Sequence, residues 1–588
     1  MHTEVLVIGG TTGGAGAGIQ CARMGVKTLI VEQTPWLGGM LTAAGVSCTD
    51  GNDELWSGIW MEFREALYQH YGTRNLFSGW VSETCFEPRV GDSIFKLFAA
   101  RENKLSVIHG WYFDETILEG GVVKGAVFQS RDGRRLKVLA DITIDATDLG
   151  DAYAASGAAY DLGMEDASYS GERMAPGSNN IIQDLTWAVI LEDHGKGTDH
   201  TIPRPADYDP TLFHCCCTDA PCNAKPWNGD AQKMLDYAKL TLSPGKKNTK
   251  YMINWPQHGN DFYINVAGLK PIDRENALLP ARQKTLGFVY FLQTQLGYKH
   301  LGIASEFPTE HGLALMPYHR EGRRLKGMVR LNVNHLTDPF GQPQPLYRTG
   351  IAVGDYPVDH HHAPEKNAPD IDFPRVPSFN IPMGALIPEK TDGMVVCEKG
   401  ISVSNIVNGS TRLQPCVLLT GQAAGVLAAL SVQKKCMPRN VGVRNVQEAL
   451  ISAKAYVMPY FDIRPGDPEW AAVQRIGATG ILRGTGVPEG WANKTLFHPD
   501  TTLMRSELRK CLAEWYGTTA ETLAEENDGP VDIAGLHEEI RKYNPKRPAR
   551  TGRKPSAPLK RREIAVLLDQ LLDPFHAEVD ITGKPVRK

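Results

Sequence analysis

The sequence predicts an α/β protein in which a nucleotide-binding domain with a parallel sheet is interrupted by a mixed α/β insertion and followed by an α-helical C-terminal domain. Three observations carry this prediction. A strand, a glycine-rich turn, a helix and a second strand follow one another over residues 4–32. A second strand–turn–helix unit, rich in glycine and alanine, occurs at residues 393–425. Short amphipathic helices begin after about residue 455.

Length and charge bound the organisation and the partners. At about 100 to 200 residues per domain, 588 residues should form roughly three or four compact units. Hydrophobic residues make up 42% and charged residues 22%, a globular balance that excludes wholesale disorder. The net charge of −4 gives no general case for nucleic acid or an anionic membrane. We therefore expect a small-molecule substrate, with no nucleic-acid and no membrane partner.

The N-terminus and the cysteines indicate a cytoplasmic protein. Met1–Glu4 leads straight into a strand, without the basic and apolar segments of an export signal. Eleven scattered cysteines, an odd number, fit reduced thiols better than a disulfide framework. The most apolar stretch, Val417–Leu430, is interrupted by polar residues and is shorter than the roughly 20 residues of a membrane span.

The first nucleotide signature is the turn between two short apolar strands. Val5–Ile8 precedes the turn, the helix Ala15–Arg23 follows it, and the strand Val26–Val31 ends in Glu32, 18 residues after Gly14. Such a turn lets backbone N–H groups and the helix dipole meet a pyrophosphate, while the acidic residue accepts hydrogen bonds from a ribose. The predicted cofactor-binding residues here are Gly9, Thr11, Thr12, Gly14 and Glu32.

Thr11 departs from the motif, because it replaces the glycine that normally allows the closest approach to a pyrophosphate. The loop must therefore shift slightly or use the threonine hydroxyl. An ordinary α/β turn is the alternative for a lone glycine match, and the surrounding strands together with Glu32 weigh against it.

A paired glycine follows in the segment Pro35–Thr42. It resembles the GG segment of two-dinucleotide-binding-domain flavoproteins, whose backbone runs past FAD, and on this resemblance Gly38, Gly39 and Met40 should contact the cofactor. The strand Asp141–Asp145 leads into a turn with Asp148 and looks like the strand that closes the FAD fold, so Asp148 is predicted at the same site.

The last cofactor piece lies far downstream. Gly393–Val396 is a predicted strand, and residues 409–415 lead into a helix that contains Gly421–Gly425. Helix N-terminal N–H groups can hydrogen-bond a flavin and stabilise its anionic reduced ring. We assign Arg412, Gln422 and Gly425 to the cofactor; the alternative is that the small residues serve close helix packing.

Together these segments resemble a family of FAD-dependent oxidoreductases whose cofactor domain is split around an inserted substrate domain, related in architecture to fumarate reductase flavoproteins. The resemblance covers approximately residues 3–435. It implies a discontinuous Rossmann-like FAD-binding domain at residues 1–160 and 381–440, an inserted mixed α/β substrate domain at 161–380, and an α-helical domain at 455–588. Glu398 and Lys399 depart from the family, which more often has small residues followed by an arginine.

Because a flavin supplies the hydride chemistry, the protein must position a substrate carbon and handle one proton. A predicted helix carries His319, Arg320, Arg323 and Arg324. We predict that Arg320 fixes an anionic or carbonyl group, and that His360 or His335 exchanges the proton. A salt-bridged helix face and a polar loop are the alternatives. No metal site is expected at His360–His362, because consecutive side chains diverge.

The cysteines suggest no further cofactor. Cys215, Cys216, Cys217 and Cys222 lack the separated pairs of iron–sulfur or zinc sites, so buried thiols are expected. A pyridine-nucleotide disulfide reductase is disfavoured, because no C-x-x-x-x-C redox pair lies near the cofactor strands and no second glycine-rich nucleotide loop follows a strand elsewhere. Cys48 is a candidate covalent flavin attachment point, with an ordinary buried thiol as the favoured interpretation.

The C-terminal third is predicted to be helical. Apolar residues at helical spacing occur at Leu508–Trp515 and Ile564–Leu571, and residues 497–508 resemble a surface-layer-homology repeat. Residues 521–540 hold seven acidic and no basic side chains, whereas 541–562 hold ten basic and no acidic ones, which suggests mutual neutralisation. We expect an appendage that packs on the catalytic part or mediates homo-oligomerisation.

Two reactions stay open. One is hydride transfer between FAD and a small polar, sugar-like hydroxylated substrate; the other acts on a carbon–carbon bond of a carboxylate, which Arg320 would bind. The electron acceptor or donor is unidentified. From another class, a flavin-binding structural or nucleic-acid-associated module would use the basic segment 541–562.

Overall fold

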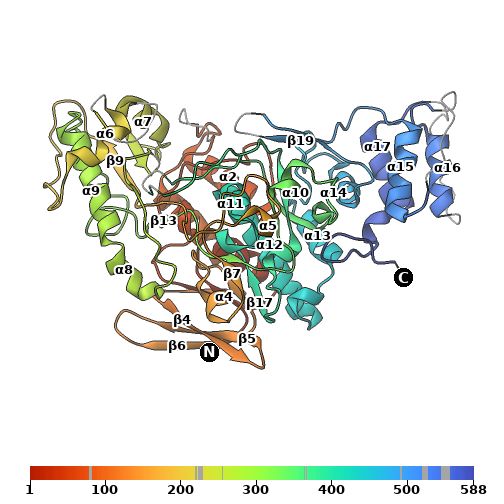
Figure 1. The fold of residues 1–588 in the computed structure, drawn as a ribbon, viewed down its shortest axis with the longest axis horizontal. Helices are drawn as coiled ribbons and strands as arrows, with labels where there is room; N and C mark the ends of the chain where they lie inside the picture. The colour runs from red at the N-terminus through yellow and green to blue at the C-terminus, as the bar shows by residue number, and fades with distance from the viewer. Residues whose placement is uncertain are drawn as a thin grey trace.

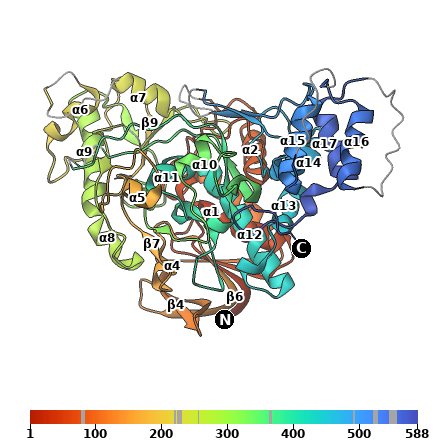
Figure 2. The same ribbon diagram turned by 45° about the vertical axis from the view of Figure 1, so that its right-hand side comes forward.

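The computed structural model describes residues 1–77, 83–218, 221–222, 230–254, 256–362, 365, 367–489, 493–519, 528–544 and 557–587. A central region around the main sheet lies between two lateral ones (Figures 1 and 2). Helices α6–α9 lie on one side and the C-terminal helices α15–α17 on the other.

The main sheet has seven strands in the order β3-β2-β1-β6-β5-β4, with β17 paired to β6. The strands β3, β2, β1, β6 and β17 are parallel, whereas β4 and β5 form an antiparallel extension. This confirms the predicted α/β class and its Rossmann-like strand order. The strands are β1 (His2–Ile8), β2 (Thr28–Glu32), β3 (Leu105–His109), β4 (Tyr112–Glu119), β5 (Val122–Gln129), β6 (Arg135–Asp145) and β17 (Met394–Val396).

Two helices that lie far apart in the sequence pack against each other on this sheet. They are α1 (Thr12–Arg23) and α12 (Gln414–Lys434). Glycines allow the close approach. A Cβ on Gly421 would lie 2.0 Å from the carbonyl oxygen of Gly13, and one on Gly425 would lie 2.5 Å from that of Ala17. The small residues of α12 therefore bring its backbone against α1.

Helix α12 is longer than the apolar stretch that the sequence suggested. Among the described residues it is the one helix long and apolar enough to cross a membrane. Its most apolar window is 89% buried inside the protein. A core helix of a globular protein has the same length and hydropathy, and α12 occupies such a position.

The insertion has its own small sheets and its own apolar core. One sheet has the order β10-β9-β12 and another the order β11-β8-β13. The strands are β8 (Leu185–Thr186), β9 (Val189–Asp193), β10 (Lys250–Ile253), β11 (Asp261–Phe262), β12 (Leu301–Ile303) and β13 (Tyr318–His319); the helices α7 (Ala231–Ala238) and α9 (Leu279–Thr294) cover them.

The helix predicted for residues 319–324 is wrong. Tyr318–His319 is strand β13, and Arg324–Leu325 is strand β14, paired with β7 (Tyr160–Asp161). The arginines explain the difference, because Arg320 and Arg324 are buried and face acidic residues far along the chain, whereas an arginine-rich helix face would be solvated. Arg324 Nη2 lies 2.6 Å from Glu165, so these are internal ion pairs and not a solvated helix face.

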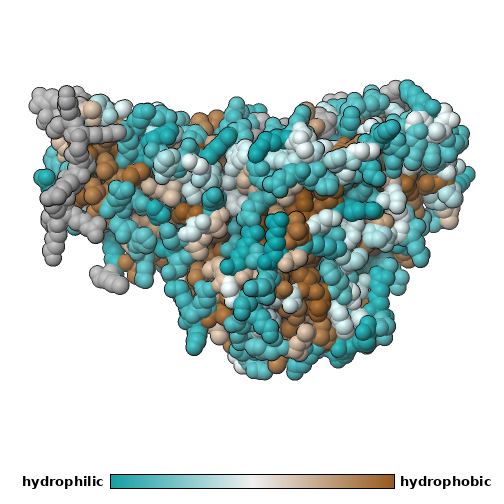
Figure 3. Space-filling model, turned by 180° about the vertical axis from the view of Figure 1, so that it is seen from behind, coloured by the Kyte–Doolittle hydropathy of each residue, from teal (hydrophilic) through white to brown (hydrophobic). Residues whose placement is uncertain are grey.

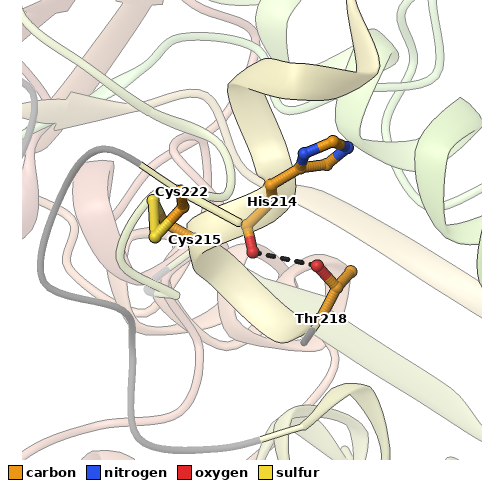
Figure 4. Close-up of a disulfide and its surroundings, with 4 residues drawn as sticks. All are labelled: His214, Cys215, Thr218 and Cys222. Atoms are coloured by element: carbon orange, nitrogen blue, oxygen red, sulfur yellow. Dashed lines mark hydrogen bonds between the residues drawn. A yellow bond between two sulfur atoms is a disulfide. The ribbon is translucent and has the colours of Figure 1, made fainter. Parts of the chain in front are cut away.

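The cysteine-rich segment also differs from its prediction. Cys215, on the short helix α6 (His214–Cys217), forms a disulfide with Cys222, and the side chain of Thr218 caps the helix by donating to the carbonyl oxygen of His214 (Figure 4). Cys216 and Cys217 are free and buried, as expected.

The C-terminal region consists mainly of helices that share the apolar core of the main sheet region. They are α14 (Trp470–Thr479), α15 (Arg505–Tyr516), α16 (Ile533–Tyr543) and α17 (Arg561–Leu571), with a hairpin of β18 (Thr485–Val487) and β19 (Lys494–Leu496). Residues 520–527 and 545–556 of the charged runs lie outside the described residues. Of the described basic residues, Lys542 pairs with Glu539 and Arg562 with Asp500. The predicted domain boundaries remain predictions.

The remaining elements connect these regions. They are α2 (Gly58–Tyr71), α3 (Pro88–Ala100), α4 (Asp151–Ala155), α5 (Ala167–Ser170), α8 (Arg274–Ala277), α10 (Val333–Thr337), α11 (Asn405–Thr411), α13 (Val443–Ser452), β15 (Gly350–Gly354) and β16 (Phe379–Pro382). From behind, hydrophobic residues gather in the lower centre of the surface, with hydrophilic residues around them (Figure 3).

Candidate functional site

A groove, which we call the cofactor groove, opens at the carboxyl edge of the main sheet. It contains a cavity of about 50 Å³ that is lined by Gly9, Thr11, Glu32, Gly39 and Asp148, among others. A Cβ on Gly39 would lie 2.7 Å from the Cα of Thr11, so the paired glycine lets the two loops touch. In open parallel sheets, ligands bind at this edge.

The threonines of the glycine turn are held by the protein itself. The hydroxyl of Thr11 donates to the carbonyl oxygen of Ala146 over 2.8 Å and accepts from the N–H of Gly14 over 3.2 Å, which caps α1. Thr12 donates to the carbonyl oxygen of Gly38 over 2.7 Å. The hydroxyl of Thr11 thus fixes the loop at the position where the usual motif has glycine.

Glu32 lies at the end of β2, as predicted, with its carboxylate turned toward the turn. Its oxygens accept from the N–H of Gly10 over 2.6 Å and from the N–H of Thr34 over 2.7 Å. Burial raises the pKa of Glu32 to about 7. A carboxyl group in this position can accept from, and when protonated donate to, a hydroxylated ligand.

Asp148 belongs to a buried ion cluster that the sequence did not predict. Lys399 Nζ lies 2.5 Å from Asp148 and 2.8 Å from Glu398, whose second oxygen accepts from the N–H of Gly13 on α1. Burial alone would lower the pKa of Lys399, but the two carboxylates raise it well above its usual range. Glu398 and Lys399, which depart from the family pattern, therefore form a charge cluster with Asp148 beside the glycine turn.

An apolar cluster links this groove to a second cavity. It comprises Met40, Ala44, Val46, Tyr318 and Val417, with Met316 packed against it. Met316 also lines the first cavity, and Val46 and Tyr318 line the second. Met40 and Val417 come from segments that the sequence assigned to the cofactor or its helix.

The second cavity, which we call the substrate cavity, has a volume of about 120 Å³. It lies at the N-terminus of α12 and is assembled from distant parts of the chain. Its lining residues are Val46, Cys48, Asp50, Tyr237, Met252, Asn254, Tyr318, Arg320, Tyr356, Asp359, His361, Arg412 and Gln414.

Arg412 organises one wall of the substrate cavity. Its guanidinium donates to the hydroxyl of Tyr318 over 2.6 Å and to the carboxylate of Asp359 over 2.8 Å. Nε2 of His361 lies 3.1 Å from the same carboxylate. Burial alone would raise the pKa of Asp359, but His361 and Arg412 hold it well below its usual range. Asp359 is therefore ionised at neutral pH.

Arg320 lies in the cavity wall, as its predicted role requires, but its donors are engaged. Nη1 donates to the carbonyl oxygen of Asp184 over 3.0 Å and to the hydroxyl of Thr186 over 2.9 Å. Nη2 donates to the carbonyl oxygen of Asn254 over 3.1 Å and lies 3.7 Å from Asp261. These bonds hold the guanidinium in place and leave it little freedom to turn toward a ligand.

The structure brings neither of the two predicted histidines into the substrate cavity. His360 points to the carbonyl oxygen of Ile406, and its other ring nitrogen lies 3.4 Å from His362. Burial lowers the pKa of His360 to about 3. His335 caps α10 through Asn332 and lines another cavity of about 370 Å³, which also contains Phe340 and Tyr460.

Gln422 and Gly425 lie against α1 and line neither the cofactor groove nor the substrate cavity. The amide of Gln422 donates to Gln20 over 3.0 Å and accepts from the N–H of Ile59 over 3.1 Å. Gly425 lies against the backbone of Ala17. The structure thus gives both residues the packing role that was the alternative interpretation, whereas Arg412 on the same stretch reaches the substrate cavity.

Cys48 lines the substrate cavity, and burial together with its neighbour Cys85 raises its pKa well above the usual range. A thiol of this kind is protonated and a poor nucleophile at neutral pH. Among the described residues, no cluster of three or more histidine, cysteine or acidic side chains is placed to hold a metal ion.

The comparisons with known proteins decide the family. The family model described as FAD dependent oxidoreductase matches residues 4–450. The chain belongs to this family. No curated protein matches it.

Three solved structures resemble this FAD-dependent oxidoreductase at low identity. A geranylgeranyl bacteriochlorophyll reductase-like protein from Thermoplasma acidophilum is 12% identical, with a TM-score of 0.34, covering 77% of this chain and 83% of its own. The p-nitrophenol 4-monooxygenase of Pseudomonas putida is 9% identical, with a TM-score of 0.33 and coverages of 76% and 84%. A triple mutant of a flavin-dependent brominase is 12% identical, with a TM-score of 0.34 and coverages of 81% and 88%.

The cofactor groove of this FAD-dependent oxidoreductase offers groups of the kind that its cofactor needs. The first turn of α1 faces the groove at Thr11, so the positive end of the helix dipole points to the place of a diphosphate, although the N–H groups of Gly13 and Gly14 are already bound to Glu398 and Thr11. Glu32 offers a carboxyl group to ribose hydroxyls, and the apolar cluster around Met40 suits a planar ring system.

Sequence reasoning missed most residues of the substrate cavity, among them Tyr318, Asp359 and His361. One signal was available. In an extended segment, residues i and i+2 point to the same side, so Asp359 and His361 form a pair that His360 cannot join. His360, which the sequence analysis named, is the neighbour of His361 in the same loop.

Proposed function

We propose that this FAD-dependent oxidoreductase exchanges a hydride with a hydroxylated carbon of a neutral, sugar-like small molecule in the substrate cavity. When bound, FAD supplies the hydride acceptor or donor. One observation carries the choice of substrate: the formal charges of the cavity lining cancel, with Asp50 and Asp359 against Arg320 and Arg412.

The uncharged part of the lining suits hydroxyl groups. It offers phenol, amide and imidazole groups, which can donate to or accept from the several hydroxyls of a sugar-like ligand. These groups belong to Tyr237, Asn254, Tyr318, Tyr356, His361 and Gln414. They supply orientation without requiring a charge on the substrate.

The reaction on a carboxylate substrate has less support. It needs a guanidinium that is free to bind the carboxylate through both Nη atoms, and in both cavity arginines these atoms already have partners. Arg412 is bound to Tyr318 and Asp359, and Arg320 lies between Thr186, Asn254 and Asp261. A buried extra negative charge would then lack a partner, which is costly in a water-poor site.

The test is an anaerobic screen of the purified holoprotein. Neutral polyols and monosaccharides are added singly, and loss of the flavin absorbance is followed with time. We expect bleaching by at least one neutral hydroxylated compound and none by saturated mono- and dicarboxylates. In the converse test, dithionite-reduced enzyme is mixed with α,β-unsaturated carboxylates; rapid reoxidation by these compounds alone would favour the carbon–carbon bond reaction and contradict the proposal.

A further inference from the structure

His361 lines the substrate cavity, and one of its ring nitrogens has no partner among the described residues. This nitrogen is Nδ1, and it is buried. A buried polar nitrogen without a partner is costly to maintain, so native proteins keep few of them. A ligand hydroxyl in the cavity is the natural partner for this atom.

The rest of the imidazole is fixed. Nε2 lies 3.1 Å from the carboxylate of Asp359, which is ionised and can only accept, so the Nε2 atom carries the proton. That hydrogen bond leaves Nδ1 as the nitrogen with the lone pair. The backbone is held as well: the N–H of His361 donates to Gln183 over 3.3 Å, and its carbonyl oxygen accepts from the N–H of Asp184 over 2.8 Å.

Arg412 holds Asp359 in turn. Its Nη2 donates to Asp359 over 2.8 Å, and its Nη1 donates to Tyr318. The chain Arg412–Asp359–His361 thus runs from a permanent cation through a carboxylate to an imidazole. A carboxylate that orients a histidine and stabilises its protonated form is the arrangement that makes the histidine an effective general base.

We propose that His361 is the catalytic base of this oxidoreductase, oriented by Asp359 as a positioning residue. The inference rests on the proposed function. In the oxidation, Nδ1 takes the proton of the substrate hydroxyl and the oxygen–carbon bond becomes double; the hydrogen on that carbon leaves as a hydride with two electrons, for which FAD, when bound, would supply the acceptor. One proton and one hydride leave the substrate, so the step balances. Asp359 stays ionised throughout.

The neighbouring histidines do not fulfil this role. Both ring nitrogens of His360 face protein atoms, Ile406 and His362. Nε2 of His362 is bound to His360, and its Nδ1 also lacks a partner among the described residues, but His362 does not line the substrate cavity. His362 therefore offers a matched control on the same loop, with the same side chain and without a place in the cavity wall.

The decisive variants are His361→Gln, Asp359→Asn and the control His362→Gln. Glutamine at position 361 can still donate to Asp359 but has no basic nitrogen. We expect flavin reduction in His361→Gln to slow by about 10²- to 10⁴-fold, the usual contribution of a general base. Asp359→Asn should slow it less, and His362→Gln should leave it unchanged. Bound-FAD absorbance and the melting temperature check that each variant is folded and loaded.

A second measurement needs no substrate. Nitrogen-15 NMR of histidine-labelled protein, with His361→Gln for assignment, should show the neutral ring of His361 as the tautomer that carries its proton on Nε2. The opposite tautomer, with the proton on Nδ1, or a wild-type rate in His361→Gln, would overturn the inference. If no neutral hydroxylated compound bleaches the flavin, the proposed substrate class fails, and the NMR result still supports or overturns the basic Nδ1 by itself.

Discussion

The cofactor groove and the substrate cavity are built from different kinds of groups. The groove depends largely on backbone: Gly39 lies against Thr11, and the first turn of α1 faces the ligand position. The cavity depends on side chains from distant segments, joined through Arg412. A site built from backbone can be recognised from residue spacing in a short stretch of sequence. A site built from distant side chains can be identified only when the fold is known.

A substitution at Lys399 tests how strongly the region around the groove depends on the charge of a side chain. The Nζ of Lys399 is fully buried between Asp148 and Glu398. Lys399→Met should leave two carboxylates without a cation and cost about 3–5 kcal/mol, the usual effect of removing one partner from a buried ion pair. Urea unfolding of the holoprotein measures the change.

The matched control replaces all three members of this cluster. Lys399→Met combined with Glu398→Gln and Asp148→Asn removes the uncompensated charges together with the lysine. It should therefore recover much of the lost stability. Equal stability of the single variant and the wild type would show that the cluster has no role in the fold.

Gly421 tests the backbone side of the comparison. A Cβ there would lie 2.0 Å from the carbonyl oxygen of Gly13, so Gly421→Ala must push α12 away from α1. We expect a loss of about 1–3 kcal/mol from overpacking and weaker FAD retention, measured by urea unfolding and by bound-flavin absorbance. Gly466→Ala, with open space around its Cβ, should change neither.

Asp355 connects the cavity loop to its surroundings and should make stability depend on pH. Its carboxylate accepts from the N–H of Asn52 over 2.7 Å, and burial raises its pKa from 3.8 to about 7. The folded protein therefore keeps a proton that the unfolded chain releases between about pH 4 and 7, so stability falls as pH rises through this window.

Asp355→Asn removes this dependence. Relative to the variant, the wild type should lose up to about 1.4 kcal/mol per pH unit inside the window. Urea unfolding at several values between pH 4 and 8 gives the difference. The exposed Asp199→Asn serves as control, and parallel curves for wild type and Asp355→Asn would contradict the prediction.

What the sequence could predict follows from the same distinction. The strand ends, the helix α1 and Glu32 were predictable, because local spacing determines them. The strands at Tyr318 and Arg324 were not, because Arg320 and Arg324 are buried against Asp261 and Glu165, which lie far away in the sequence. A glycine at position 425 is consistent with a cofactor contact and with close helix packing. The position of α1, against which Gly425 lies, decides for packing.

Tyr318 offers the finest test of the comparison, because it belongs both to the apolar cluster and to the cavity wall. Tyr318→Phe keeps the ring and removes the hydroxyl that accepts from Arg412 over 2.6 Å. Since one hydrogen bond is lost, unfolding should change by about 1 kcal/mol. FAD binding should persist. Flavin reduction should slow, because Arg412 loses its hydrogen bond to residue 318 and is then held less firmly against Asp359. Anaerobic stopped-flow measures the rate of flavin reduction, and an FAD titration measures cofactor binding, so the two effects can be separated. Weaker FAD binding with an unchanged rate per bound flavin would show that Tyr318 serves the cofactor groove. The side chains that serve the substrate would then have to lie deeper in the cavity.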